Sequence, residues 1–258
     1  MAITIAVVNQ KGGVAKTTTS INLSAALGSK GKKVLLVDLD PQGNATTGCG
    51  MGRKFNTTVF DIITGTVFYS EAVLETPFNN MSIIPATTEL ADSEVFFRKV
   101  TTDTPKTMFL RQALAAAKSE YDYIIIDCLP SLGTLALNGV TAADSVLIPM
   151  QCEPYSLDGL KELLATIRRV RGSHNPYLSI LGIVFTMTDM RLNINRAVRQ
   201  KILDNFPDLI FNSEIPRNIR IAEAPGHGKP IMYYDPSSPG ATGYDSLADE
   251  VVTRTTTT

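Results

Sequence analysis

Short apolar runs alternate along the chain with longer stretches of helical periodicity. Most of the apolar runs lack the polar alternation of a half-exposed strand, which is typical of parallel strands covered by helices on both faces. Helical periodicity over 17–29, 107–118 and 157–171 supplies the crossovers between them. The pattern predicts a doubly wound α/β fold, a mostly parallel sheet flanked by helices. The predicted strands are 3–8, 33–38, 81–85, 123–127, 145–149 and 179–185.

Nothing in the sequence divides the chain into separate units. We see no repeat, long linker or low-complexity block before the terminal TRTTTT run. A length of 258 residues is compatible with one large domain, so we expect a single domain over residues 1–253. The polar tail has no apolar face to dock, and we expect residues 254–258 to be frayed.

Composition narrows the functional classes. With 44% hydrophobic and 19% charged residues the chain can bury a sizeable core, which excludes a disordered or collagen-like protein. The net charge of −1 predicts no global attraction to nucleic acid or membrane, so such a partner must be met by a local patch. The three cysteines, Cys49, Cys128 and Cys152, lie in or beside apolar runs and indicate buried thiols in a reducing compartment. We therefore expect a cytoplasmic protein.

The segment NQKGGVAKTTT, residues 9–19, follows the first predicted strand and opens a helix. Glycines let backbone N–H groups converge on phosphate oxygens, and the helix N-terminus adds its positive dipole end. Lys16 can reach the β- and γ-phosphates and Thr17 can offer a hydroxyl to Mg²⁺. The strict pattern G-x-x-x-x-G-K-[ST] is absent, because Gln10 and Ala15 occupy its two glycine positions.

The segment resembles the deviant Walker A motif of the ParA/MinD family of P-loop ATPases, K-G-G-x-x-K-T, whose additional lysine is Lys11 here. VDLDPQGN at 37–44 is similar to the family's switch I, and IIIDCLPSL at 124–132 is similar to its Walker B and switch II. IPRNIR at 215–220 and AEAPGHGKP at 222–230 resemble the C-terminal segment of chromosomal, Soj-type ParA proteins. The resemblance implies a slow ATPase that uses ATP and Mg²⁺.

The same resemblance implies the site residues. It gives catalytic roles to Lys11, Lys16 and Asp40, and Mg²⁺ contacts to Thr17, Asp40 and Asp127. Pro216 and the 186–188 loop are expected at the adenine. The nucleotide-binding set is Lys11, Gly12, Gly13, Val14, Ala15, Lys16, Thr17, Thr18 and Pro216.

The aspartates of these motifs can be interpreted structurally as well as functionally. Asp127 follows three isoleucines, so it is either a solvent-exposed strand end or a ligand at the carboxyl edge of the sheet, where such folds bind ligands. Of the two aspartates after the second strand, we expect Asp40 to orient the attacking water and Asp38 to brace the loop.

Two positions depart from the family pattern. Ala15 replaces a more frequent glycine, and a Cβ at positive φ costs about 1–2 kcal/mol, so we expect a right-handed backbone there. Leu129 replaces a second proline after the Walker B Asp-Cys pair, which removes no chemical group.

Lys11 on its own could be a solvated turn lysine. In the family this lysine crosses a dimer interface to the nucleotide of the other subunit, which offsets phosphate repulsion only when the γ-phosphate is present. The resemblance therefore implies an ATP-dependent sandwich homodimer.

Basic residues concentrate late in the chain. Residues 161–201 hold eight Lys or Arg and two acidic residues, which favours non-specific binding of double-stranded DNA over an ordinary solvated face. Arg191 and Arg220 match the context of DNA-binding arginines in Soj-type relatives, whereas Arg196 and Arg199 are inferred from charge alone. We expect a nucleoid-associated ATPase that positions a plasmid, chromosome origin or organelle and is stimulated by a ParB-like or other cargo adaptor.

Other readings fit less of the sequence. A membrane-bound, MinD-like ATPase needs a C-terminal amphipathic helix, which DEVVTR followed by threonines does not offer. An Fe–S reductase needs paired cysteines, which the spacing does not give. An ATP-dependent small-molecule enzyme on the same fold stays open, although no separate substrate motif is evident.

Overall fold

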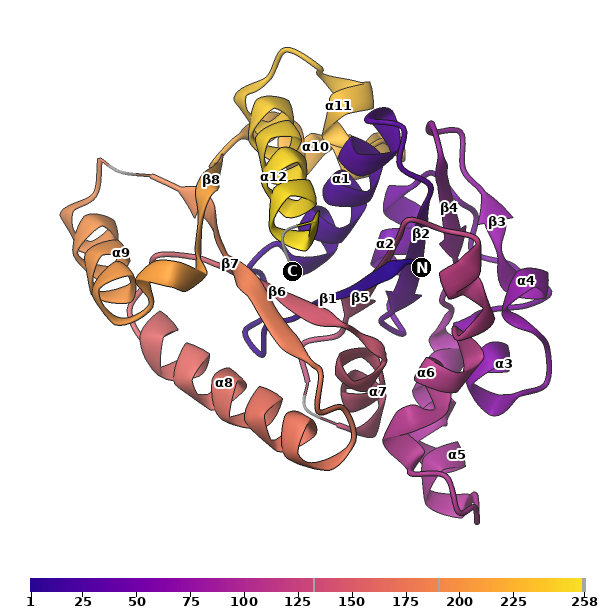
Figure 1. Ribbon diagram of the computed structural model, residues 1–258. Helices are drawn as coiled ribbons and strands as arrows, with labels where there is room; N and C mark the ends of the chain where they lie inside the picture. Colours follow the sequence, from indigo (N-terminus) through magenta and orange to yellow (C-terminus); the bar gives the residue numbers. More distant parts are fainter. Residues whose placement is uncertain (132, 190, 257–258) are drawn as a thin grey trace.

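The computed structural model describes residues 1–131, 133–189 and 191–256, and its strands in these ranges form one sheet in the order β3-β4-β2-β5-β1-β6-β7-β8 (Figure 1). Neighbouring strands are parallel except for β3 and β4. This confirms the predicted doubly wound α/β fold. The strands are β1 (Ile3–Val7), β2 (Val34–Leu39), β3 (Leu74–Glu75), β4 (Met81–Ile84), β5 (Tyr123–Cys128), β6 (Ser145–Met150), β7 (Ser179–Thr188) and β8 (Ile210–Pro216).

Helices connect the strands on both faces. The predicted 107–118 helix is broken into η2, α6 and η3, a bent path that still buries Leu110, Leu114 and Ala117. The α-helices are α1 (Lys16–Ser29), α2 (Asn44–Gly48), α3 (Val59–Thr64), α4 (Tyr69–Ala72), α5 (Ser93–Lys99), α6 (Phe109–Ala113), α7 (Thr134–Ala142), α8 (Ser156–Ser173), α9 (Asn193–Asn205), α10 (Ile219–Glu223), α11 (Ile231–Tyr234) and α12 (Pro239–Thr256). The 3₁₀ turns are η1 (Thr88–Asp92), η2 (Lys106–Met108), η3 (Ala116–Ser119), η4 (Pro207–Leu209) and η5 (Ala224–His227).

The apolar runs of the strands feed two cores, one on each face of the sheet. Ile5 and Val7 of β1 join the core under α1 and α12, whereas Ala6 and the following Val8 join the core under α7 and α8 (Figure 1). Successive side chains of a strand point to opposite faces, so a wholly apolar strand is the expected result of burial on both.

Two strands were not predicted. β8 is an edge strand in which Asn212, Ser213 and Glu214 interrupt the apolar run, and β3 is only two residues long. An edge strand is covered on fewer sides, and its composition is correspondingly less apolar.

The expected frayed tail is wrong for residues 254–256, which form the last turn of α12. The Arg254 guanidinium donates to the carbonyl oxygens of Leu181 and Ile210, pairs with Glu250 at 2.8 Å and lies 3.9 Å from the centroid of the Phe211 ring. These contacts fix the helix end to β7 and β8. Residues 257 and 258 lie outside the described residues. Among the described helices, none combines the length and apolarity needed to cross a membrane.

Candidate nucleotide-binding site

The loop between β1 and α1 is an open cradle at the carboxyl edge of the sheet. β1 lies between β5 and β6, and α1 begins at Lys16 with no acidic residue in its first turn and no side-chain cap. A Cβ added at Gly12 or Gly13 would meet no atom within 4 Å, and Gly13 has φ +74°. Room for a ligand in front of the N–H groups of a helix N-terminus that has no side-chain cap suits a phosphate group.

The expectation of a right-handed backbone at Ala15 is wrong. Ala15 has φ 67° and ψ 33°, in the left-handed region, and immediately precedes α1. Its carbonyl accepts the N–H of Thr19 at 2.8 Å, which starts the helix. The chain therefore keeps the loop geometry that glycine would adopt without strain and carries the cost of a Cβ there.

Lys16 lies almost buried at the centre of the loop. Its Nζ donates to the carbonyl oxygen of Lys11 at 3.0 Å, so the two ends of the loop are joined across the cradle. Burial lowers the pKa of Lys16, while the nearby Asp127 carboxylate acts in the opposite direction. An ammonium group with so little solvation is poised to exchange a carbonyl oxygen for phosphate oxygens.

Asp38 and Asp127 stand opposite each other on the paired strands β2 and β5, and both are fully buried. Burial is the main cause that raises the pKa of each; the Asp38 carboxylate adds to the rise at Asp127, and the Asp40 carboxylate adds to the rise at Asp38. Asp38 accepts the N–H and hydroxyl of Thr46 at 2.8 and 2.7 Å and the N–H of Asp40. Asp38 therefore holds the loop after β2, as the brace role requires.

One carboxylate oxygen of Asp127 can still accept a ligand. Its Oδ1 accepts the Ser20 hydroxyl at 2.8 Å, whereas its Oδ2 is buried with no hydrogen-bond partner among the described atoms. A buried carboxylate oxygen without a partner, beside the first turn of α1, fits a site for a hydrated Mg²⁺. The residues present therefore suit the metal that the sequence implies, with Asp127 as its strand-borne carboxylate.

Asp40 lies nearer the rim than Asp38. It is partly exposed, and its Oδ1 accepts the N–H of Gln42 at 2.9 Å. That bond fixes the carboxylate on the loop after β2, at the same edge of the sheet as the phosphate loop. The assignment of the attacking water to Asp40 stays a prediction.

Three contacts from the end of β6 and the loop between β6 and α8 hold the phosphate loop. The Asn9 side chain donates to the carbonyl of Pro149, Gln151 Nε2 donates to the carbonyl of Gly13 at 3.1 Å, and Lys11 Nζ pairs with Glu153 Oε2 at 2.5 Å. Sequence reasoning missed Gln151 and Glu153, because nothing in a run of isolated polar residues marks them as neighbours of residues about 140 positions earlier.

A cavity of about 450 Å³ adjoins the start of α1. Its lining joins Ala15 and Thr18 to Thr186 and Pro216, which brings the residues expected at the adenine next to the phosphate loop. The Thr186 hydroxyl also donates to the carbonyl of Val14 at 3.1 Å. Most of the remaining lining comes from the 186–188 loop and the two C-terminal motifs, whereas Ile221 and Tyr244 lie outside any motif. The remaining lining residues are Met187, Ile215, Arg217, Asn218, Ile219, Ile221, Ala222, Pro225 and Tyr244.

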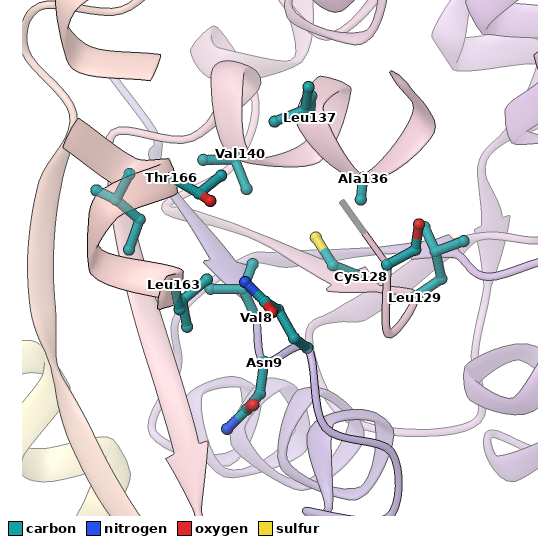
Figure 2. Close-up of a pocket in the computed structure, with 12 residues that line it drawn as sticks. Val8, Asn9, Cys128, Leu129, Ala136, Leu137, Val140, Leu163 and Thr166 are labelled. Carbon is teal, nitrogen blue, oxygen red and sulfur yellow. The ribbon is translucent and has the colours of Figure 1, made fainter. Parts of the chain in front are cut away.

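The opposite side of the loop is closed. Figure 2 shows Val8 and Asn9 near Cys128 and Leu129. The void that these residues line is only about 10 Å³. A space of that size is at the lower limit for one water molecule. Leu129 therefore fills the position of the family's proline within a packed seam that connects β1 and β5 to α7 and α8.

The four arginines considered for DNA binding differ in their partners. Arg191 pairs with Asp189 at 2.6 Å and Arg220 with Glu223 at 3.0 Å, but both stay largely exposed. Among the described residues, the Arg196 guanidinium donates to the neutral side chain of Asn193. Arg199 pairs with Glu214 at 2.6 Å and lies over the ring of Phe185.

These pairings separate the four arginines expected to bind DNA into exposed and partly buried ones. The side chain of Arg199 is 31% exposed against 87% for Arg191. Arg199 is therefore fixed on the sheet by Glu214 and Phe185, and of the four expected arginines the exposed ones at this edge are Arg191, Arg196 and Arg220.

A cradle with two lysines follows the central strand β1, and buried aspartates lie near the carboxyl ends of the paired strands β5 and β2. This arrangement defines a P-loop nucleoside triphosphatase of the deviant Walker A class. A family model described as an AAA domain matches residues 2–180. The sporulation initiation inhibitor protein Soj of Bacillus subtilis (strain 168) is 48% identical over 248 residues, 96% of this chain and 97% of that protein.

A second relative is the chromosome-partitioning ATPase Soj of Treponema pallidum (strain Nichols), 45% identical over 254 residues and 98% of both chains. Among solved structures, cobyrinic acid a,c-diamide synthase from Mycobacterium smegmatis with bound ADP and magnesium has a TM-score of 0.86 at 36% identity, covering 99% of this chain and 96% of that chain. The chain belongs to the ParA/Soj family of chromosome-partitioning ATPases.

Proposed function

We propose that this protein is a Mg²⁺-dependent partition ATPase that binds DNA as an ATP-loaded dimer and carries a cargo over the nucleoid. The observation that carries the enzymatic part is the open glycine cradle beside the partnerless Oδ2 of Asp127. The partition role rests on near full-length similarity to relatives named for chromosome partitioning.

Different residues of the site bind the phosphates, the adenosine, the metal ion and the attacking water. Lys16 and the N–H groups at the start of α1 hold the phosphates, and the 450 Å³ cavity takes the adenosine. Thr17 and Asp127 would hold Mg²⁺, which neutralises phosphate charge during phosphoryl transfer. Asp40 orients the attacking water from the rim of the site.

Lys11 connects nucleotide state to dimer state. In the described structure it is neutralised by Glu153, and its side chain is 45% exposed at the carboxyl edge. When two nucleotide-loaded edges face each other, the phosphates are a stronger attraction for Lys11 than one half-exposed carboxylate. ATP therefore favours the sandwich dimer, and hydrolysis dissolves it.

DNA binding depends on the dimer, because dimerisation doubles the number of exposed arginines at the carboxyl edge. Arg191, Arg196 and Arg220 give each subunit a small set of phosphate contacts, which is weak on its own. A dimer presents both sets together and gains affinity by multivalency. A ParB-like or other cargo adaptor that speeds hydrolysis would release the protein from the nucleoid.

The two other functions have less support. The apolar face of α12 is not available as a MinD-like membrane anchor, because Tyr244, Leu247 and Val251 are buried against the core. A small-molecule enzyme has one observation in its favour, the solved relative named as a cobyrinic acid a,c-diamide synthase. Its identity of 36% is lower than the 48% and 45% of the Soj relatives.

DNA binding measured with ATP and with ADP at fixed ionic strength tests the proposal. We expect affinity for a 60-bp duplex to be at least tenfold higher with ATP, to fall steeply with salt and to be lost in Arg196→Glu and Arg220→Glu. Arg98→Glu on α5, another exposed arginine, is the matched control. Equal affinity in the two nucleotide states, or ATP turnover that requires a small carboxylic acid and an amine donor, contradicts it.

A further inference from the structure

The basic residues of 161–201 do not form one surface. α8 begins directly after β6, at the carboxyl edge, and ends before β7, at the amino edge of the parallel sheet (Figure 1). Its 18 residues span about 27 Å. Arg168, Arg169 and Arg171 lie in the last two turns, so they are at the end of the sheet opposite the nucleotide site and Arg191.

Among the described residues, these three arginines have no acidic partner within ion-pairing distance. Residues 165–178 contain three arginines, one histidine and no acidic residue. Arg168, Arg169 and Arg171 are exposed, and within residues 1–131, 133–189 and 191–256 their side chains make no hydrogen bond or ion pair. At the carboxyl edge, by contrast, Arg191 and Arg220 each have an acidic partner.

The chain around these arginines is fixed. Asn175 is buried and donates to the carbonyl oxygens of Thr141 and Ala143 at 3.1 and 2.7 Å, which holds the turn after α8 against α7. The same turn carries Tyr177, whose side chain is 87% exposed. A rigid helix end and turn thus present three guanidinium groups and one phenol to solvent, with little flexibility to lose on binding.

We propose that Arg168, Arg169, Arg171 and Tyr177, here called the amino-edge patch, form a second binding surface for the DNA phosphate backbone. Guanidinium groups without counter-charges release condensed cations from DNA, and tyrosine hydroxyls contact phosphates without reading sequence. This proposal rests on the proposed function, because DNA is chosen over other polyanions on the ground that the proposed function includes DNA binding.

The position of the patch has a consequence for the dimer. Two subunits that meet at their nucleotide edges direct their amino edges away from each other. Each dimer therefore carries the patch at both far ends, in addition to the arginines near the interface. One ATP-bound dimer can hold separate DNA segments at once, and so bridge them.

A two-duplex retention assay tests this directly. A 100-bp duplex is fixed to beads, and the retained fraction of a free fluorescent 60-bp duplex is measured with a non-hydrolysable ATP analogue. We expect R168E/R169E to retain at least tenfold less than wild type and R168Q/R169Q to give an intermediate value. R98E/K99E on α5 is the control, because it reverses the same number of exposed charges on another helix.

Single-duplex binding supplies the second readout. With ADP, where the proposed dimer is absent, R168E/R169E should lower the slope of log affinity against log salt by about 2, one for each lost phosphate contact. ATP turnover should stay at the wild-type rate, because both residues lie at the edge opposite the nucleotide site.

Two results would overturn the proposal that the amino-edge patch binds DNA. One is retention in R168E/R169E equal to that of R98E/K99E; the other is arginine-dependent binding to phosphatidylglycerol vesicles but not to DNA. Failure of the proposed function looks different: wild-type DNA affinity would not respond to ATP, whereas the ADP comparison of the variants would still report on the patch.

Discussion

Lys11 Nζ and Glu153 Oε2 lie 2.5 Å apart and join the phosphate loop to the segment that begins α8. Both side chains are almost half exposed, at 45% and 43%, so the pair contributes no more than about 1 kcal/mol. It holds Lys11 beside its own subunit in the absence of nucleotide. In the proposed dimer Lys11 reaches the partner's nucleotide, so forming that dimer would break this pair, and Glu153 would oppose dimerisation by a small amount.

Glu153→Gln should make dimerisation easier. Removing the counter-charge frees Lys11, and a loss of up to about 1 kcal/mol corresponds to about two- to fivefold less ATP analogue at half-dimerisation. Sedimentation velocity across an analogue titration measures the shift. Glu162→Gln, an exposed glutamate on α8, is the control. A higher analogue requirement in Glu153→Gln would show that Glu153 supports the dimer instead.

Binding and turnover should separate in two variants of the site. Lys16→Gln removes the ammonium at the centre of the cradle and should abolish ATP binding, because phosphates would lose their main charged contact. Asp40→Ala should bind ATP and dimerise but turn over at least a hundredfold more slowly. Equilibrium binding of a fluorescent ATP analogue and phosphate release distinguish the two steps. If the Asp40→Ala protein hydrolyses ATP at the wild-type rate, Asp40 does not orient the attacking water.

Ala15→Gly should stabilise the protein. Glycine relieves the left-handed strain at φ 67° but adds freedom to the unfolded chain, so we expect a net gain of about 0.5–1 kcal/mol in the free energy of unfolding. Urea denaturation measures it. Ala25→Gly, inside α1, should do the reverse because a helical alanine has no such strain. A loss of stability in Ala15→Gly would mean that the methyl group makes contacts worth more than the strain.

Asp127 should make stability depend on pH in the absence of nucleotide and metal. Burial, with the facing Asp38 carboxylate, raises the pKa of Asp127 from 3.8 to about 7. Between these values the folded protein holds a proton that the unfolded chain releases, so the contribution of Asp127 to stability falls as pH rises from about 4 to about 7.

Asp127→Asn removes this titration. We expect its advantage in free energy of unfolding over wild type to grow from pH 5 to pH 7 and then level off, measured by urea denaturation. Asn can still accept the Ser20 hydroxyl, so the comparison isolates the buried charge. The variant should also lose the stabilisation that Mg²⁺ and ATP together give the wild type. Parallel pH curves for the two proteins would rule out a titrating Asp127.

The sequence was enough to predict that most residues of the candidate site lie near one another, because they follow strand ends. A parallel sheet brings the carboxyl ends of β1, β2 and β5 to one edge, so Lys16, Asp38 and Asp127 could be placed together from motif order alone. Glu153 and Gln151 could not, since their partners are about 140 residues away and neither residue belongs to a motif. The register of β6 beside β1 creates those contacts.

Local conformation was harder to predict than topology. Ala15 was expected to be right-handed from the cost of its Cβ, but the bonds that begin α1 and the demands of the loop outweigh that cost. The polar tail looked frayed because its threonines have no apolar face. Arg254 anchors it through carbonyl oxygens and a ring, contacts that a hydrophobic pattern does not encode.

The central claim is that two subunits close over two triphosphates, each contributing Lys11 to the other's site. Light scattering of wild type and Lys11→Ala with saturating non-hydrolysable ATP analogue and Mg²⁺ tests it most directly. We predict a dimer of twice the 27.9 kDa chain for wild type and a monomer for Lys11→Ala, although both bind the analogue. A wild-type protein that stays monomeric under these conditions, or a Lys11→Ala protein that dimerises equally well, would contradict the account.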